Sequence, residues 1–207
     1  MTTLSTLTSN VATYVNRSDF TTQIQLAINR AIKYYSRRNT FWFNETTGTF
    51  STVASQLAYG SADGVPTDIL KREDVTITIN SSDIVTLTPR TLDYVLERNI
   101  SNVTGTPTDY AFFQNKFYIY PVPDAAYTIT VYYKKSYAEL TSSDNNDFTD
   151  NAEDLLEARA SWWIYHKLLR NEEAAASAKA EELEALGALQ NETRRTVSSG
   201  KVRPDSF

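Results

Sequence analysis

Residues 110–133 read YAFFQNKFYIYPVPDAAYTITVYY, and this stretch decides the fold class. Tyr110–Phe113 and Lys116–Tyr120 flank the dipeptide Gln114-Asn115, which predicts a β-hairpin. After a break at 121–124 that holds two prolines, large apolar residues alternate with threonine over 127–133. Such alternation is typical of a strand with one buried face. The centre of the chain therefore predicts antiparallel β structure.

The same period of two extends upstream of this stretch. Val75, Ile77 and Ile79 alternate with polar residues, and a polar turn at 80–83 leads into a partner strand through 85–87. A short helix is expected from about Pro89 to Asn99, because proline suits the first helical position. We expect residues 46–144 to form an inserted small antiparallel β domain.

Both ends of the chain show helical spacing instead. A short helix is expected over residues 4–15, and a longer one has its apolar face at 20, 24, 28, 31 and 35. On the far side, a helix from about residue 149 to 170 precedes an Ala/Glu-rich helix from 172 to about 190. The predicted fold is α+β. Residues 1–45 and 145–193 form a discontinuous helical bundle, and residues 194–207 form an extended C-terminal tail.

Composition excludes several classes of site. The chain of 207 residues has no cysteine, which removes disulfides and thiolate metal sites. Its formal net charge of −5 should repel nucleic acid as a whole. The N-terminus has no signal peptide pattern, and no apolar run is long enough to cross a bilayer. We therefore expect a soluble protein without a membrane partner.

Residues that carry chemistry are scarce. His166 is the only histidine, no acidic neighbour for it is evident, and we interpret it as a core or interface residue. Glu153 and Asp154 open a helix, where acidic side chains stabilise the positive end of the dipole. The glycines form no phosphate-binding loop, and residues 144–147 lack calcium-loop spacing. We expect no catalytic, cofactor-binding or metal-binding residue, and no enzyme activity.

Two charged regions remain to be explained. Arg30, Lys33, Arg37 and Arg38 form a basic stripe on the second helix, beside aromatic residues. The stripe could contact phosphates, or it could face acidic residues such as those of the helix that begins at Glu172. The tail is also basic, with Arg194, Arg195, Lys201 and Arg203.

The helix over residues 149–170 is apolar on several sides, more than a small bundle can cover. A ring of identical subunits needs one patch that meets a different patch on the next copy. Large aromatic side chains are suitable anchors for such a contact. Candidate residues for a subunit interface are Trp162, Trp163, Tyr165 and Leu169.

The chain resembles the head-to-tail adaptor, or connector, proteins of tailed bacteriophages. The similarity covers about residues 4 to 190 and depends on the order and spacing of several motifs. These motifs are 14–20 (YVNRSDF), 65–70 (VPTDIL), 105–110 (GTPTDY), 117–124 (FYIYPVPD), 127–133 (YTITVYY) and 154–158 (DLLEA).

The resemblance implies a structural protein of the virion neck, made in the host cytoplasm. It implies a homo-oligomeric ring, typically a dodecamer, that docks beneath the portal protein and extends the DNA channel. Double-stranded DNA would pass through without specific binding, and downstream tail or nozzle proteins would attach below. On this view Glu181, Glu182 and Glu184 are candidates for the channel lining. The residues expected to bind the portal are Arg194, Arg195, Lys201, Arg203, Pro204 and Phe207.

Two other functions stay open at this stage. A tail-completion or tail-tube subunit would share the acidic, aromatic-rich composition, but we would expect more β structure and less C-terminal helix. A small DNA-binding packaging protein would need an exposed basic helix with affinity for duplex DNA.

Overall fold

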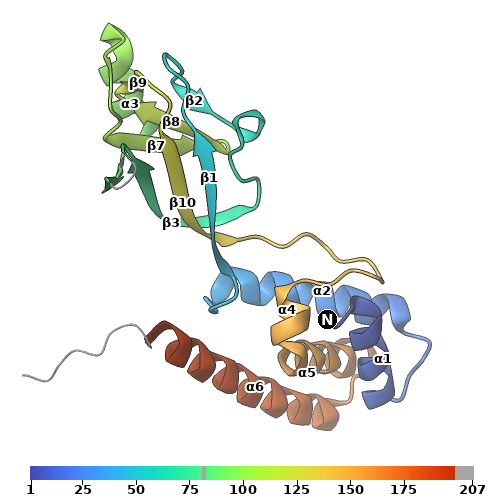
Figure 1. The fold of residues 1–207 in the computed structure, drawn as a ribbon. Coiled ribbons are helices and arrows are strands. Elements are labelled where there is room, and N and C mark those ends of the chain that lie inside the picture. Colours follow the sequence, from blue (N-terminus) through green and yellow to red (C-terminus); the bar gives the residue numbers. More distant parts are fainter. Residues whose placement is uncertain (81–82, 199–207) are drawn as a thin grey trace, which may run out of the picture. The chain divides into compact units, whose positions relative to one another are not determined.

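The computed structural model describes residues 1–80 and 83–198. Its chain divides into two compact units (Figure 1). The helical unit joins Met1–Asn44 to the chain from Tyr137 onward, and the β unit is Glu45–Ser136. Helices contributed by both ends of the chain thus enclose one core, while the strands form another. The predicted α+β fold class is confirmed.

The helical unit is built around α5, which packs against α1, α2 and α6. Its core takes Leu7, Ile28, Tyr35, Phe148 and Leu156 from four helices, two at each end of the chain. The elements of this unit are α1 (Leu4–Tyr14), α2 (Thr21–Arg38), α4 (Asp147–Asn151), α5 (Glu153–Ile164), a π-helical turn (Tyr165–Leu169) and α6 (Glu172–Ser198).

The β unit contains two four-stranded sheets, ordered β1-β10-β3-β4 and β2-β8-β7-β5, and a short parallel pair, β6-β9. Its strands are β1 (Glu45–Ser51), β2 (Ala58–Tyr59), β3 (Ile69–Thr78), β4 (Ile84–Thr86), β5 (Thr88–Pro89), β6 (Thr104–Gly105), β7 (Asp109–Phe113), β8 (Lys116–Tyr120), β9 (Val122–Pro123) and β10 (Thr128–Lys135). Its helices are α3 (Leu92–Arg98) and the 3₁₀ turns Ser61–Asp63 and Asn99–Ser101. Both large sheets contribute to one core, in which Ile77 and Ile129 meet Phe117 and Ile119.

The predicted hairpin is confirmed as β7 and β8, which pair antiparallel. Gln114 and Asn115 both have positive φ, 50° and 58°, as a two-residue turn between twisted strands requires. The alternation over 127–133 is confirmed as β10, whose partners are β1 and β3. Strand β10 is therefore central to its sheet.

Three boundaries differ from the predicted ones. The helix expected from about 149 to 170 is broken at Ala152, where φ is −138°, and it ends in the π-helical turn. The β unit ends at Ser136, earlier than the expected 144, because the next segment bonds to the helices. For example, the Leu140 amide donates to Asn29 and the Leu4 amide donates to Asp144.

The C-terminal helix is longer than the sequence predicts. Helix α6 continues to Ser198, so Arg194 and Arg195 are helical rather than part of an extended tail. Leu189, near the end of the Ala/Glu-rich segment, is buried, so the packed face reaches at least to this residue. The rest of the predicted tail, 199–207, lies outside the described residues. Over residues 1–80 and 83–198, no helix has both the length and the apolar character needed to cross a membrane.

Gly48 in β1 provides a test of the packing in the β unit. A methyl group at this position would overlap the ring of Pro66. We expect Gly48→Ala to lower the free energy of unfolding by about 1–3 kcal/mol through overpacking, measured by urea denaturation.

Gly187→Ala in α6 is the matched control, because no atom lies within 4 Å of the added methyl. It should be neutral or stabilise by up to about 1 kcal/mol, since alanine favours helix. Equal stability of the Gly48→Ala variant and the wild type would contradict the contact.

Candidate functional site

A buried carboxylate anchors α6 to the rest of the helical unit. Oε1 of Glu182 accepts hydrogen bonds from the Tyr35 hydroxyl, from Arg159 at 3.0 Å and from Lys179 at 2.9 Å. Only 3% of the Glu182 side chain is exposed. Burial and the bond to Glu182 raise the pKa of Tyr35 well above its usual range. The three donors come from α2, α5 and α6, so one group joins three helices.

Arg159 is held on its faces as well as at its tip. Its guanidinium lies 4.2 Å from the ring centroid of Tyr34 and 4.4 Å from that of Trp162. Cation–π contacts of this kind are worth most where water is excluded. Sequence reasoning missed Arg159. The available signal was a single cation in an otherwise apolar stretch of the helix, which predicts a buried partner of opposite charge.

The three glutamates expected to line a channel occupy different environments. Glu182 is buried, so the prediction that it lies on a channel surface is wrong for the single chain. A helical turn carries neighbouring residues to different faces, and position 182 faces α5. Glu181 and Glu184 are exposed on α6, and the channel-lining role stays a prediction for these two.

The four residues expected at a subunit interface are each partly buried within the chain. Trp163 and Leu169 pack against the helical core, and the Tyr165 hydroxyl donates to the Tyr14 carbonyl. Trp162 stacks on His166 with ring centroids 5.5 Å apart. These contacts cover much of the apolar surface that the sequence leaves unassigned. The interface role of the four residues stays a prediction.

His166 has the acidic neighbour that the sequence does not reveal. Nδ1 of His166 lies 3.0 Å from a carboxylate oxygen of Glu172, at the start of α6. Within the described part of the chain, Glu172 is its only hydrogen-bonding partner, so no hydroxyl stands in position as a nucleophile. No cluster of acidic and histidine side chains suited to a metal ion occurs in the described residues.

The basic stripe of α2 lies on the protein surface. Arg30, Lys33, Arg37 and Arg38 are all exposed. Arg30 lies over the ring of Trp163 and Arg38 over that of Tyr34. The described residues provide no ion-pair partner for any of the four. The acidic helix α6 is therefore not the partner of this stripe within one chain.

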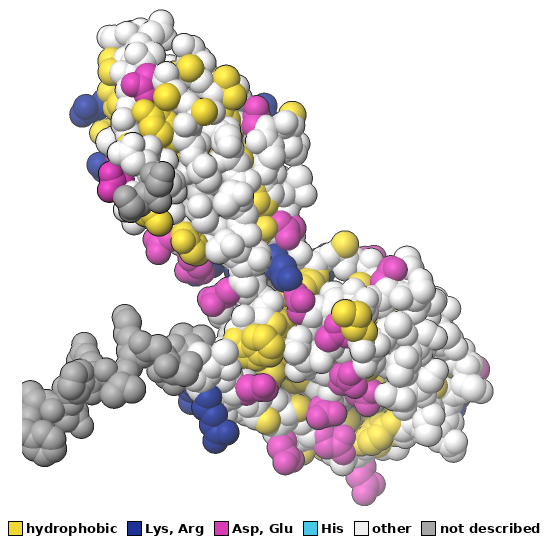
Figure 2. Space-filling model, viewed as in Figure 1, with side chains coloured by type: hydrophobic (Ala, Val, Ile, Leu, Met, Phe, Trp, Pro, Cys, Tyr) yellow, Lys and Arg dark blue, Asp and Glu magenta, His cyan; other side chains and the backbone are white. Residues whose placement is uncertain are grey.

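The residues expected to bind a portal protein fall into two groups. Arg194 and Arg195 are exposed near the end of α6. Lys201, Arg203, Pro204 and Phe207 lie outside the described residues. Figure 2 shows basic side chains at this end of α6, on a face where acidic side chains are otherwise prominent.

The acidic side chains surround a groove along α6. Three adjoining hollows of about 350, 290 and 330 Å³ share Asp154, Ala185 and Tyr14 between neighbours. Their walls come from α1, α4, α5, α6 and the adjacent turns. We call these hollows the acidic groove, because seven carboxylates line them and, among the described residues, no lysine or arginine does. The seven are Asp150, Glu153, Asp154, Glu157, Glu173, Glu181 and Glu192.

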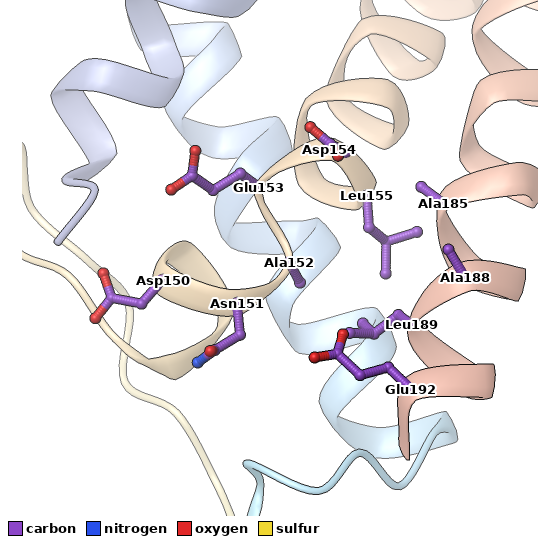
Figure 3. Close-up of a pocket in the computed structure, with 10 residues that line it drawn as sticks. All are labelled: Asp150, Asn151, Ala152, Glu153, Asp154, Leu155, Ala185, Ala188, Leu189 and Glu192. Atoms are coloured by element: carbon purple, nitrogen blue, oxygen red, sulfur yellow. The ribbon is translucent and has the colours of Figure 1, made fainter. Parts of the chain in front are cut away.

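The floor of the acidic groove is apolar. Figure 3 shows Leu155 of α5 pointing toward Ala185, Ala188 and Leu189 of α6, with Glu192 on the same helix. Small side chains on α6 leave room above the buried leucines. The groove therefore combines negative charge at its edges with an apolar surface at its base.

The hydrogen-bonding partners of these carboxylates are neutral. Asn10 donates to Glu157 at 2.7 Å, and Tyr14 donates to Glu181 at 2.8 Å. Burial raises the pKa of Glu157, and the charges of Asp154 and Glu153 raise it further against the effect of the Asn10 bond. Burial and the bond to Glu181 raise the pKa of Tyr14 to about 12. Both shifts have the sign expected for negative charge that no cation offsets.

The family model described as SU10 adaptor protein matches residues 2–205. The chain therefore belongs to this family of phage head-to-tail adaptors. Such a family is typically non-enzymatic and implies a component of the virion neck that contacts portal and tail proteins. A comparison with curated proteins found no match.

The buried cluster gives a first prediction for this unit. We expect Arg159→Ala to lower the free energy of unfolding by about 3 kcal/mol, because it leaves the buried Glu182 without one of its two countercharges. The loss should shrink in the double variant Arg159→Ala/Glu182→Ala, which removes both charges. Denaturation in urea measures both values.

Lys167→Ala is the control, because Lys167 is exposed and belongs to the same helical stretch. It should change stability by less than about 0.5 kcal/mol. A loss for Arg159→Ala no larger than that of this control would rule out an anchoring role.

Glu157 gives a prediction about pH. Its pKa is higher in the folded than in the unfolded chain, so its ionisation at neutral pH favours unfolding. Glu157→Gln should therefore raise the melting temperature at neutral pH. The difference in melting temperature between the variant and the wild type should vanish as the pH falls to about 4, because the wild-type side chain becomes neutral there.

Exposed Glu184 supplies the comparison for this measurement. Glu184→Gln should change the free energy of unfolding at neutral pH by less than about 0.5 kcal/mol. A Glu157→Gln effect that is independent of pH would show that packing, rather than charge, is responsible.

Proposed function

We propose that this chain is a non-enzymatic ring subunit of the phage neck, placed between the portal protein and the tail. Membership of the adaptor family over nearly the whole chain is the observation that carries the proposal. The ring would be dodecameric and would extend the channel through which DNA passes. The net charge of −5 suits such a channel, because an acidic lining does not hold the phosphate backbone.

The β unit offers surface for further partners. Ile84, Leu96, Ile100 and Phe113 are exposed apolar side chains of this unit, and 81% of Ile100 is accessible. Ile84 belongs to β4, an edge strand of its sheet. Exposed apolar groups and free strand edges are common at protein contacts. We infer that tail or nozzle proteins attach to surfaces of this unit.

The portal contact is assigned to the basic C-terminal end. A variant that ends at Ser198 lacks Lys201 and Arg203 but keeps the whole of α6. We expect it to have the melting temperature of the wild type and to lose binding to the purified portal. The reason is that the truncation removes the charge attraction between the basic C-terminal end and an acidic surface of the portal. Co-sedimentation with the portal measures the binding, and electron microscopy shows whether an axial ring forms below it.

A full-length variant with Lys201→Glu and Arg203→Glu separates charge from chain length. It should fail to bind as the truncated variant does. Portal binding at wild-type strength by both variants would show that the C-terminal end does not make the contact. The absence of a ring with the wild type would overturn the proposed function.

A further inference from the structure

The acidic groove needs an occupant with positive charge. Seven carboxylates line it, and the groups that donate to Asp150, Glu157 and Glu181 are neutral. Burial is the main cause of the raised pKa of Glu157, and the neighbouring charges of Asp154 and Glu153 raise it further. The groove also has an apolar floor, which would accept the aliphatic part of a long side chain. This floor includes Leu155, Ala185 and Leu189. Arginine and lysine have both properties.

A surface of matching chemistry exists on the same chain. Leu26, Arg30, Lys33 and Arg37 follow one another at spacings of four, three and four residues in α2, which places them on one face of the helix. All four are exposed, and 41% of Leu26 is accessible. We call these four residues the α2 stripe. It is about 16 Å long, at 1.5 Å per helical residue.

One chain cannot join its own two surfaces. The groove takes no lining residue from α2, and α5 packs against both α2 and α6. In the described residues the three cations of the stripe form no ion pair. The groove and the α2 stripe are thus two different, complementary patches of one molecule. Patches of this type make a head-to-tail contact that can close into a ring.

We propose that the α2 stripe of one copy docks in the acidic groove of the next. This rests on the proposed ring and names the surfaces that build it. Leu26 would lie on the apolar floor, and Arg30, Lys33 and Arg37 would pair with carboxylates along the groove. The occupant is a second copy of this chain, because its stripe provides the positive charge that the groove lacks and an apolar side chain that suits the groove floor.

Charge exchange between the two surfaces tests the proposal. The groove variant carries Glu181→Lys and Glu192→Lys, and the stripe variant carries Arg30→Glu, Lys33→Glu and Arg37→Glu. Each should raise the protein concentration needed for half-maximal ring assembly, with portal present, by about tenfold or more. The exchange variant carries all five substitutions. Its groove keeps five carboxylates and gains two lysines, so it repels the acidic stripe less than the wild-type groove does. The exchange variant should therefore assemble at a lower protein concentration than the stripe variant. Native mass spectrometry and electron microscopy measure assembly.

A charge-matched control carries Glu139→Lys and Glu184→Lys, two exposed residues of the helical unit that do not line the groove. It should assemble like the wild type. Thermal unfolding of each variant identifies any that fails to fold, and the neutral versions Glu181→Gln/Glu192→Gln and Arg30→Gln/Lys33→Gln/Arg37→Gln then replace it.

The outcomes separate this inference from the proposed function. Assembly of both single-surface variants at wild-type strength would overturn the docking but leave the ring intact. An exchange variant that assembles no better than the stripe variant would also overturn it, since a portal or tail segment would then be the occupant of the groove. Absence of any ring with the wild type would overturn the ring itself.

Discussion

One buried carboxylate determines where the longest helix of this protein lies. Helix α6 offers the core mainly alanines, Ala175 and Ala178 among them, together with Leu189. Alanine buries little apolar area. Hydrophobic packing alone therefore only weakly fixes the rotation of such a helix about its axis and its register along its neighbours. Glu182 adds bonds to Tyr35 and Arg159 that form at a single register. Since α6 makes one wall of the acidic groove, the shape of that groove depends on this cluster.

The cluster also explains how much of the structure the sequence could predict. Period-two and helical spacing predicted the β7–β8 hairpin, strand β10 and the buried face of α2, because apolar periodicity reflects burial directly. Spacing carries no information about a partner across the fold. Glu182 therefore resembled its exposed neighbours in sequence, and Arg159 attracted no notice. Likewise, nothing local to His166 indicated that Glu172 would lie beside it.

The boundaries that differ follow from interactions between distant segments. The chain after Ser136 contains polar residues that suit a linker, yet Asn29 of α2 holds it by accepting from and donating to Leu140. The break at Ala152 has no proline or glycine to mark it. The acidic groove was also absent from the sequence prediction, because its carboxylates come from several helices and meet only after folding. Net charge showed that acidic residues are in excess but not where they gather.

The β unit begins and ends on neighbouring strands. Its first strand, β1, pairs antiparallel with its last, β10, so that Glu45 and Lys134 face each other across the ladder. A domain whose two ends lie together can be inserted into a host at a single point, without separating the elements on either side. Evolution could lengthen, shorten or exchange this part while the helical scaffold keeps its own core.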